Sequence, residues 1–343
     1  MNRLHRAAAA ALVIATFVAA PLVARGAREP AAGVSASDAQ GSGAPADVQK
    51  VHLAIGYIPH VQFTPLYVGI AQGFYREEGI DLEISYGFGV DVFSLLAAGS
   101  IDIGLSDSDQ LVLAGSKGLG LAAIYQYYQR YPVSIVAKKS TAAKPADLAG
   151  KVIGTPEMYG TSYLGMRLFL KKYGLTDRVK VERIGYTQLE SLEAGRVDAV
   201  VCFSNNEPIV FAAHGVPVSE WLVRDFSTMV GASFISSRAI IAKRADALAG
   251  FYRATKKAMA WTMDHRDEAF RIALQTVGNV KSEEEPLFRK RLDATCELFP
   301  HPKGFGHLDR VRWEKSIEEL AALGLVPAAY PADTILANIE GAR

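Results

Sequence analysis

The chain has 343 residues, half of them hydrophobic, and its 37 basic residues nearly balance its 36 acidic ones. This length suits two lobes, each with a sizeable hydrophobic core. The formal net charge is only +1, and no basic run is interleaved with aromatic residues. Because the sequence has no basic segment that would attract a polyanion, we expect no nucleic-acid partner.

Residues 1–27 are typical of a secretory signal peptide. Arg3 and Arg6 precede an uncharged run, residues 7–24, that is rich in Ala, Val and Leu. The run is also long enough for an uncleaved membrane anchor. Residues 28–50 are small, polar and aperiodic, which predicts a disordered spacer. We therefore expect secretion across the inner membrane to a periplasmic or other extracytoplasmic location.

From residue 51 to about residue 236, short strands alternate with helices. This alternation indicates βαβ units and an α/β fold with mostly parallel sheets. We predict strands at 51–57, 80–86, 101–105, 121–127, 133–137, 151–154, 179–184, 197–203, 217–223 and 229–236. The helices between them end at Gln72, Ala98, Ser116, Tyr173, Ala194 and His214.

A repeated segment organises this region. Leu96–Asp109 reads LAAGSIDIGLSDSD and Leu192–Asn205 reads LEAGRVDAVVCFSN. In each copy a helix ends at a glycine, Gly99 or Gly195, and a short apolar strand with a polar end follows. Ligands of open α/β sheets bind beyond the carboxyl ends of the strands. The repeat therefore predicts two similar lobes, each with a polar strand end.

Beyond Arg238 the pattern changes to long amphipathic helices, predicted at 245–276, 282–298 and 307–323. Trp261, Phe270 and Trp313 recur at helical spacing among apolar residues, so we expect them in the core.

Cysteine and histidine patterns give no sign of catalysis. Cys202 and Cys296 lie on different predicted segments, which favours two buried thiols over a disulfide. The seven histidines form no H-E-x-x-H motif, and no cysteine pair has metal-ligand spacing. We therefore expect no catalytic residue, no metal and no cofactor.

Polar and aromatic residues gather instead at strand-to-helix junctions, as in a small-molecule pocket. A helix cap explains Thr161 equally well, whereas Tyr159, Tyr186 and the run Asn205–Glu207 are poorly explained as caps. Carboxylates are frequent at the strand ends, with few cations nearby, which favours a neutral or cationic heterocycle over a sulfonate, nitrate or phosphate. The candidate ligand-binding residues are Gln62, Phe63, Asp107, Tyr127, Tyr159, Thr161, Tyr186, Asn206 and Glu207.

Four motifs resemble extracytoplasmic solute-binding proteins of ABC importers, in the branch named for thiamine-pyrimidine proteins, which also holds sulfonate, taurine and nitrate binders. They are GYIPHVQFTPLY (56–67), GFYREEGIDL (73–82), LLAAGSIDIG (95–104) and PADLAGKVIG (145–154). Within that branch, five further motifs look most like riboflavin-binding members: QFTPLY (62–67), QRYPVSIV (129–136), YGTSYLG (159–165), IGYTQLESL (184–192) and NNEP (205–208).

The chain departs from these relatives in lacking a lipoprotein cysteine and in carrying Gly89 where we expect an acidic residue. A thiamine pyrimidine precursor or a small sulfonate therefore remains an alternative ligand. The family also includes fungal enzymes that make the thiamine pyrimidine with a cysteine-rich motif. Two isolated cysteines cannot supply that motif, so we expect no enzyme.

The resemblance implies a two-lobe, type II periplasmic binding fold that closes on its ligand by hinge motion. We place lobe 1 at residues 51–132, lobe 2 at 133–230, and the return to lobe 1 with the C-terminal helices at 231–343. The expected protein is a monomer that delivers riboflavin, or a similar flat heterocycle, to the permease and ATPase subunits of an importer. Tyr127, Tyr159 and Tyr186 would stack on that ligand, and Gln62, Asp107, Asn206 and Glu207 would hydrogen-bond to it.

Overall fold

The computed structural model describes residues 48–87, 90–327 and 330–340. The predicted signal peptide lies outside this range, as does the predicted spacer except for its last three residues. Two of those three, Gln49 and Lys50, belong to the first strand, contrary to the prediction. The backbone N–H of Gln49 donates to Gly79 O at 2.8 Å, and Lys50 pairs with Glu83 on the neighbouring strand. Pairing with a second strand thus orders residues whose own composition suggests disorder.

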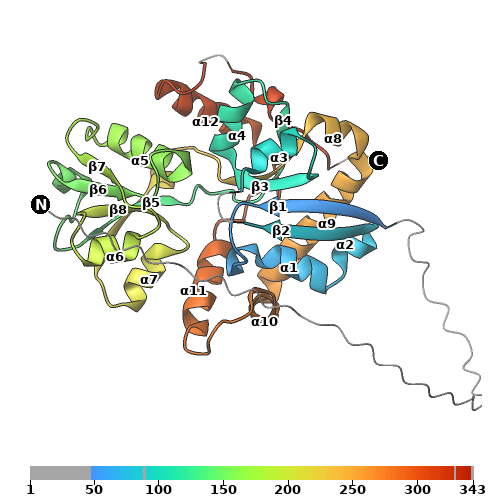
Figure 1. Ribbon diagram of the computed structural model, residues 1–343, viewed down its shortest axis with the longest axis horizontal. Coiled ribbons are helices and arrows are strands. Elements are labelled where there is room, and N and C mark those ends of the chain that lie inside the picture. The colour runs from blue at the N-terminus through green and yellow to red at the C-terminus, as the bar shows by residue number, and fades with distance from the viewer. Residues whose placement is uncertain (1–47, 88–89, 328–329, 341–343) are drawn as a thin grey trace, which may run out of the picture. The chain divides into compact units, whose positions relative to one another are not determined.

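Two mixed sheets, each of five strands in the described part of the chain, form the framework (Figure 1). The first has the order β2-β1-β3-β10-β4, and the second the order β7-β6-β8-β5-β9. In each sheet three neighbouring strands are parallel and the fourth in the order, β10 or β5, pairs antiparallel on both sides. Four strands of each sheet therefore point the same way, as the α/β prediction requires. The bounds are β1 Gln49–Ile55, β2 Ile80–Tyr86, β3 Ile103–Asp107, β4 Leu121–Gln126, β5 Val133–Lys138, β6 Val152–Thr155, β7 Lys180–Arg183, β8 Ala199–Phe203, β9 Val218–Leu222 and β10 Ala232–Ser237.

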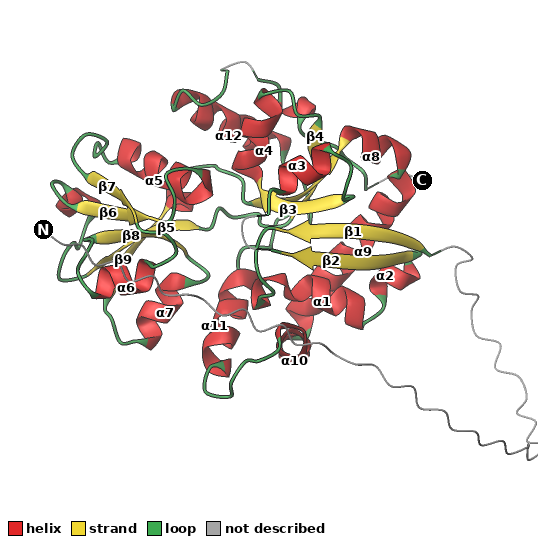
Figure 2. Ribbon diagram, in the orientation of Figure 1, coloured by secondary structure: helices red, strands yellow, loops and turns green. Residues whose placement is uncertain are grey.

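Helices cover both faces of each sheet (Figure 2). Alternation along β1 explains this, since Leu53 and Ile55 pack in one hydrophobic cluster with α1, α2, α9 and α10, while Ala54 packs in another with α3, α4 and α12. The helices are α1 Thr64–Ala71, α2 Phe74–Glu77, α3 Val92–Ala97, α4 Ser108–Ser116, α5 Gly160–Lys172, α6 Gln188–Glu193, α7 Glu207–Ala213, α8 Arg238–Lys243, α9 Ala245–Asp264, α10 Arg266–Val277, α11 Glu285–Cys296 and α12 Arg310–Ala322.

The sequence repeat corresponds to the same local structure in both sheets. Gly99 and Gly195 both have φ of 69°, the left-handed conformation that ends α3 and α6. The aspartate of each copy then accepts a hydrogen bond from the neighbouring parallel strand, Asp102 Oδ2 from His52 N of β1 and Asp198 Oδ2 from Val152 N of β6, both at 2.9 Å. The spacing shared by the two copies thus gives β3 and β8 the same side-chain hydrogen bond to a parallel neighbour.

Two connections join the sheets, residues 127–132 from β4 to β5 and residues 223–231 from β9 to β10. Helix α12 holds both of them. The guanidinium of Arg312 donates to Gln129 O in the first connection, and to Thr228 O and Met229 O in the second at 3.0 and 2.9 Å. The Glu319 carboxylate accepts from the backbone N–H and the hydroxyl of Thr228, both at 2.7 Å. Helix α12 therefore fixes the position of one connection relative to the other.

Several predicted elements differ from the structure. The helix predicted at 245–276 is two helices, because His265 leaves the helical conformation at φ −125° and its ring stacks on Trp261. Helix α8 was not predicted, and it starts where the Ser237 hydroxyl accepts from Ile240 N. Trp313 and Phe270 are buried as expected, whereas Trp261 is only partly buried.

The two thiols, Cys202 and Cys296, are buried and free, as predicted. In the described ranges, no helix combines the length and the apolar character needed to cross a bilayer.

Candidate ligand-binding cleft

A cavity of about 410 Å³ opens where the carboxyl ends of the parallel strands of the two sheets face each other. Its walls include residues that follow β1, β3 and β4 in one lobe and β6, β7 and β8 in the other. The volume lies within the range of small-molecule sites in proteins. All nine candidate residues from the sequence line this cavity.

Gln62 and Phe63 lie in a 3₁₀ turn, Val61–Phe63, directly before α1. The carbonyl of Gln62 accepts a hydrogen bond from the Tyr127 hydroxyl at 2.7 Å, and its side-chain oxygen accepts from Tyr128 at 3.1 Å. Phe63 is buried against Tyr86. This turn is therefore held to the end of β4 by two tyrosine hydroxyls.

Tyr127 has a different role from the predicted ring stacking. Its side chain is fully buried, and its ring packs edge-on against Phe234 and Phe299 at centroid distances of 5.2 Å. The ring thus leaves no open face for a ligand. Tyr127 supports the cavity floor through its hydrogen bond to Gln62, 65 positions away in the chain. Because this role depends on Gln62, Phe234 and Phe299, which are all distant in sequence, it could not be inferred from the residues next to Tyr127.

Asp107 ends β3 and Asp109 lies in the first turn of α4. Burial, and then the charge of Asp109, raise the pKa of Asp107 to about 7. Asp109 is buried and accepts from Thr161 Oγ1 of α5 at 2.7 Å and from the Tyr131 hydroxyl at 2.8 Å. Thr161 thus caps no helix here, and its hydroxyl joins the two lobes.

Tyr159 and Tyr186 stand at the mouth of the cavity on the second lobe. They are 72% and 64% exposed, far more than other aromatic residues of the cavity wall. Tyr159 immediately precedes α5, and Gly160 turns the chain with φ of 78°. Their neighbour Glu157 is engaged by the Arg183 guanidinium. Both rings are therefore more than half exposed at this edge of the cavity.

Asn206 and Glu207 begin α7. The Glu207 carboxylate accepts from Phe203 N at 2.9 Å and from Asn206 Nδ2 at 3.0 Å, and burial raises its pKa. The Glu207 carboxylate therefore closes the turn between β8 and α7. Asn206 lines the cavity, and its Oδ1 is buried with no hydrogen-bond partner among the described residues.

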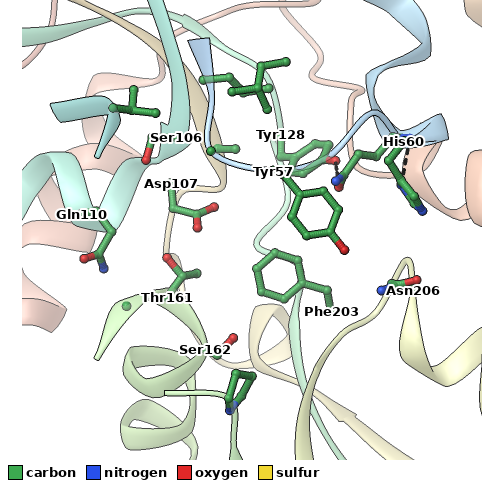
Figure 3. A pocket seen from close by; sticks show the side chains of 18 of the residues that line it. Tyr57, His60, Ser106, Asp107, Gln110, Tyr128, Thr161, Ser162, Phe203 and Asn206 are labelled. Atoms are coloured by element: carbon green, nitrogen blue, oxygen red, sulfur yellow. Dashed lines mark hydrogen bonds between the residues drawn. The ribbon is translucent and has the colours of Figure 1, made fainter. Parts of the chain in front are cut away.

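The sequence prediction missed several residues of the wall, namely Tyr57, His60, Ser162, Gln110, Tyr128 and Phe203. Tyr57 and Phe203 lie at the ends of β1 and β8, so the strand-end rule that found Asp107 applies to them too. Figure 3 shows their rings facing one another across the cavity. His60 is held neutral, because burial and the charge of Arg291 lower its pKa to about 4.

The wall carries four acidic residues and no lysine or arginine among the residues that the structure places there. Two of the four are already engaged, Asp91 with Ser94 at the start of α3 and Glu157 with Arg183. Asp107 and Glu207 remain as carboxyl groups without a cationic partner in the wall. The cavity is therefore suited to neutral or cationic ligands and poorly suited to anions.

Comparison with known proteins agrees with this architecture. The family model described as NMT1/THI5 like matches residues 60–269. The riboflavin-binding protein RibY of Chloroflexus aurantiacus is 29% identical over 300 residues, 85% of this chain and 86% of that protein. A formylaminopyrimidine-binding protein of Halalkalibacterium halodurans is 28% identical over 289 residues, 80% of this chain and 86% of that protein.

Among solved structures, the periplasmic aliphatic sulphonate binding protein SsuA of Escherichia coli superposes with a TM-score of 0.66 at 16% identity, covering 84% of this chain and 97% of that one. The two-sheet fold with its cleft is thus the architecture of solute-binding proteins of ABC importers. Since the family model covers more than half of the chain, the protein belongs to the NMT1/THI5 like family. The resemblance seen in the sequence motifs is confirmed.

Proposed function

We propose that this protein is the solute-binding component of an ABC importer and that its ligand is riboflavin or a closely related flat, uncharged heterocycle. The observation that carries the proposal is the pair of exposed rings, Tyr159 and Tyr186, at the mouth of a cavity whose described wall holds four acidic residues and no lysine or arginine. Stacking on a planar ligand would cover both rings and add to the gain from area burial. A relative named as a riboflavin-binding protein supports the same ligand.

A thiamine pyrimidine precursor is the second candidate. The carboxyl group of Asp107, which has no lysine or arginine beside it in the described wall, could accept hydrogen bonds from an amino group on a pyrimidine, and a relative is named as a formylaminopyrimidine-binding protein. A sulfonate is the weaker alternative, because the wall, as far as the structure describes it, offers no guanidinium or ammonium group.

A catalytic role through cysteine is not favoured. Burial raises the pKa of both thiols, that of Cys296 to about 12, so neither is a thiolate at neutral pH. Neither lines the cavity. We propose instead that ligand capture and release are the whole activity, carried out by an exported monomer that presents its closed form to the permease.

The test is a titration of the purified mature protein with riboflavin, followed by flavin fluorescence. A thermal-shift assay with the pyrimidine precursor and with an alkanesulfonate runs in parallel. Saturable quenching at a 1:1 ratio supports the riboflavin proposal. Absence of quenching, together with a thermal shift from the pyrimidine alone, would replace riboflavin by the pyrimidine.

A further inference from the structure

The cavity has two chemically different ends (Figure 3). One, here called the aromatic end, presents the rings of Tyr57, Tyr128 and Phe203. The other, the polar end, presents hydroxyl, amide and carboxyl groups and, among the residues labelled there, no ring. The polar end consists of Ser106, Asp107, Gln110, Thr161 and Ser162.

The polar end is assembled from both lobes. Ser106 and Asp107 close β3, Gln110 lies in α4, and Thr161 and Ser162 lie in the first turn of α5. The hydrogen bond from Thr161 Oγ1 to Asp109 Oδ1 fixes α5 against α4 behind these groups. Gln110 Nε2 also donates to Asp109 Oδ1, at 3.1 Å, so its side-chain oxygen points away from that carboxylate. The positions of these groups are therefore set by buried contacts.

A planar ring and a hydroxylated chain place different demands on such a surface. The rings of the aromatic end, together with those of Tyr159 and Tyr186 at the mouth, can stack on a fused heterocycle. The polar end offers serine hydroxyls that both donate and accept, a glutamine carbonyl that accepts and a carboxyl group that accepts from hydroxyls. A chain that carries a hydroxyl on each carbon can satisfy several of these groups at once, whereas a ring edge can satisfy only a few.

The ionisable side chains at the polar end are acidic. Asp107 faces the cavity with Asp109 buried behind it, and no lysine or arginine lines the cavity in the described ranges. The N-terminus of α5 contributes a partial positive charge of about half a unit. This is too little to balance the Asp109 carboxylate even while Asp107 holds a proton, so a dianionic phosphate placed here would meet net repulsion in a poorly hydrated site.

We infer that the polar end is a specificity site that binds an uncharged, hydroxylated chain and rejects a phosphorylated one, so that the protein takes free riboflavin and not its 5′-phosphate. The inference rests on the proposed function, since it assigns the two parts of that ligand to the two ends of the cavity.

Three compounds distinguish binding of the ring, the hydroxylated chain and the phosphate. They are riboflavin, its 5′-phosphate FMN, and lumichrome, which has the tricyclic alloxazine ring without the hydroxylated chain. The wild-type protein should bind FMN at least about tenfold more weakly than riboflavin. Asp107→Asn should raise the ratio of FMN affinity to riboflavin affinity about tenfold, and should change lumichrome affinity less than riboflavin affinity. Asp177→Asn, which removes an exposed acid outside the cavity, is the matched control and should leave all three affinities as in the wild type.

Ser162→Lys provides a gain-of-function arm that does not depend on removing Asp107. It places a cation at the polar end and should strengthen FMN binding at least about tenfold. Ser100→Lys adds the same charge on an exposed turn that does not line the cavity and should not strengthen it.

Equal wild-type affinity for FMN and riboflavin would overturn the inference. So would an Asp107→Asn effect of the same size on lumichrome and riboflavin, or failure of folded Ser162→Lys to gain FMN. In each of these cases riboflavin still binds, and the proposed function stands. If the wild-type protein binds no flavin at all, the proposed function itself is wrong and this assignment falls with it.

Discussion

Thr161 and Asp109 form a hydrogen bond of 2.7 Å between the lobes, from the threonine hydroxyl of α5 to the carboxylate of α4. Both side chains are buried, and the same carboxylate accepts from the Tyr131 hydroxyl at 2.8 Å in the connection between β4 and β5. One carboxylate therefore contacts both the hinge region and the opposite lobe. This arrangement is suited to stabilise the closed form behind a bound ligand.

We predict that Thr161→Val opens the lobes more readily. The substitution keeps the shape of the side chain but leaves Asp109 Oδ1 with one fewer donor, at a cost of about 2 kcal/mol to the closed form. Ligand dissociation, measured by stopped-flow fluorescence, should be about tenfold faster or more, with little change in the association rate. Thr262→Val is the control, because the Thr262 hydroxyl donates only within its own helix, to Ala258 O. An unchanged dissociation rate in Thr161→Val would show that the Thr161–Asp109 hydrogen bond does not stabilise the closed form.

Asp107 should make stability depend on pH. Its pKa lies at about 7 in the folded chain against an ordinary value of 3.8, because of burial and the neighbouring charge of Asp109. The folded protein thus holds this proton more tightly than the unfolded chain, and stability falls as pH rises from about 4 to about 7. The other titratable groups that face Asp107 are the hydroxyls of Tyr128, Tyr131 and Tyr186.

Asp107→Asn cannot ionise, so its stability relative to the wild type should be about 2 kcal/mol greater at pH 8 than at pH 5. Urea denaturation at the two pH values measures the difference. Asp177→Asn should show no such pH-dependent gain. The same stability difference at both pH values would mean that ionisation of Asp107 is not its cause.

The tyrosines at the cavity mouth should matter for affinity. Tyr159→Ala and Tyr186→Ala each remove a ring that is more than half exposed in this conformation, and each should weaken riboflavin binding by about 1–2 kcal/mol. Fluorescence titration gives the dissociation constants. Tyr173→Ala serves as the control, since Tyr173 is also exposed but packs against Phe169 and Phe226 away from the cavity. If Tyr159→Ala and Tyr186→Ala both bind riboflavin like the wild type, these two rings do not stack on the ligand.

Arg312 should be a major determinant of stability. Its partly buried guanidinium donates to three carbonyls in the two connections between the sheets, and burial lowers its pKa. Arg312→Gln should therefore cost about 3 kcal/mol of unfolding free energy in urea. Arg310→Gln, two residues away, removes exposed ion pairs with Glu314 and Asp333 and should cost less than about 1 kcal/mol. Equal losses in the two variants would show that α12 does not hold the connections.

Much of this protein could be read from its sequence. The repeat around Gly99 and Gly195, the alternation of strands and helices, and the polar strand ends are local patterns, set by backbone conformation and the spacing of apolar residues. They identified the fold and placed all nine candidate residues on the wall of one cavity.

Only the tertiary structure decided what each of those residues does there. Tyr127 is buried beneath the cavity by Phe234 and Phe299, Thr161 bonds to Asp109 across the lobes, and Glu207 accepts from Phe203 N in the turn before its helix. Burial, hydrogen-bond partners and the resulting pKa values depend on segments distant in the chain, and a local pattern contains no information about which of these segments will meet.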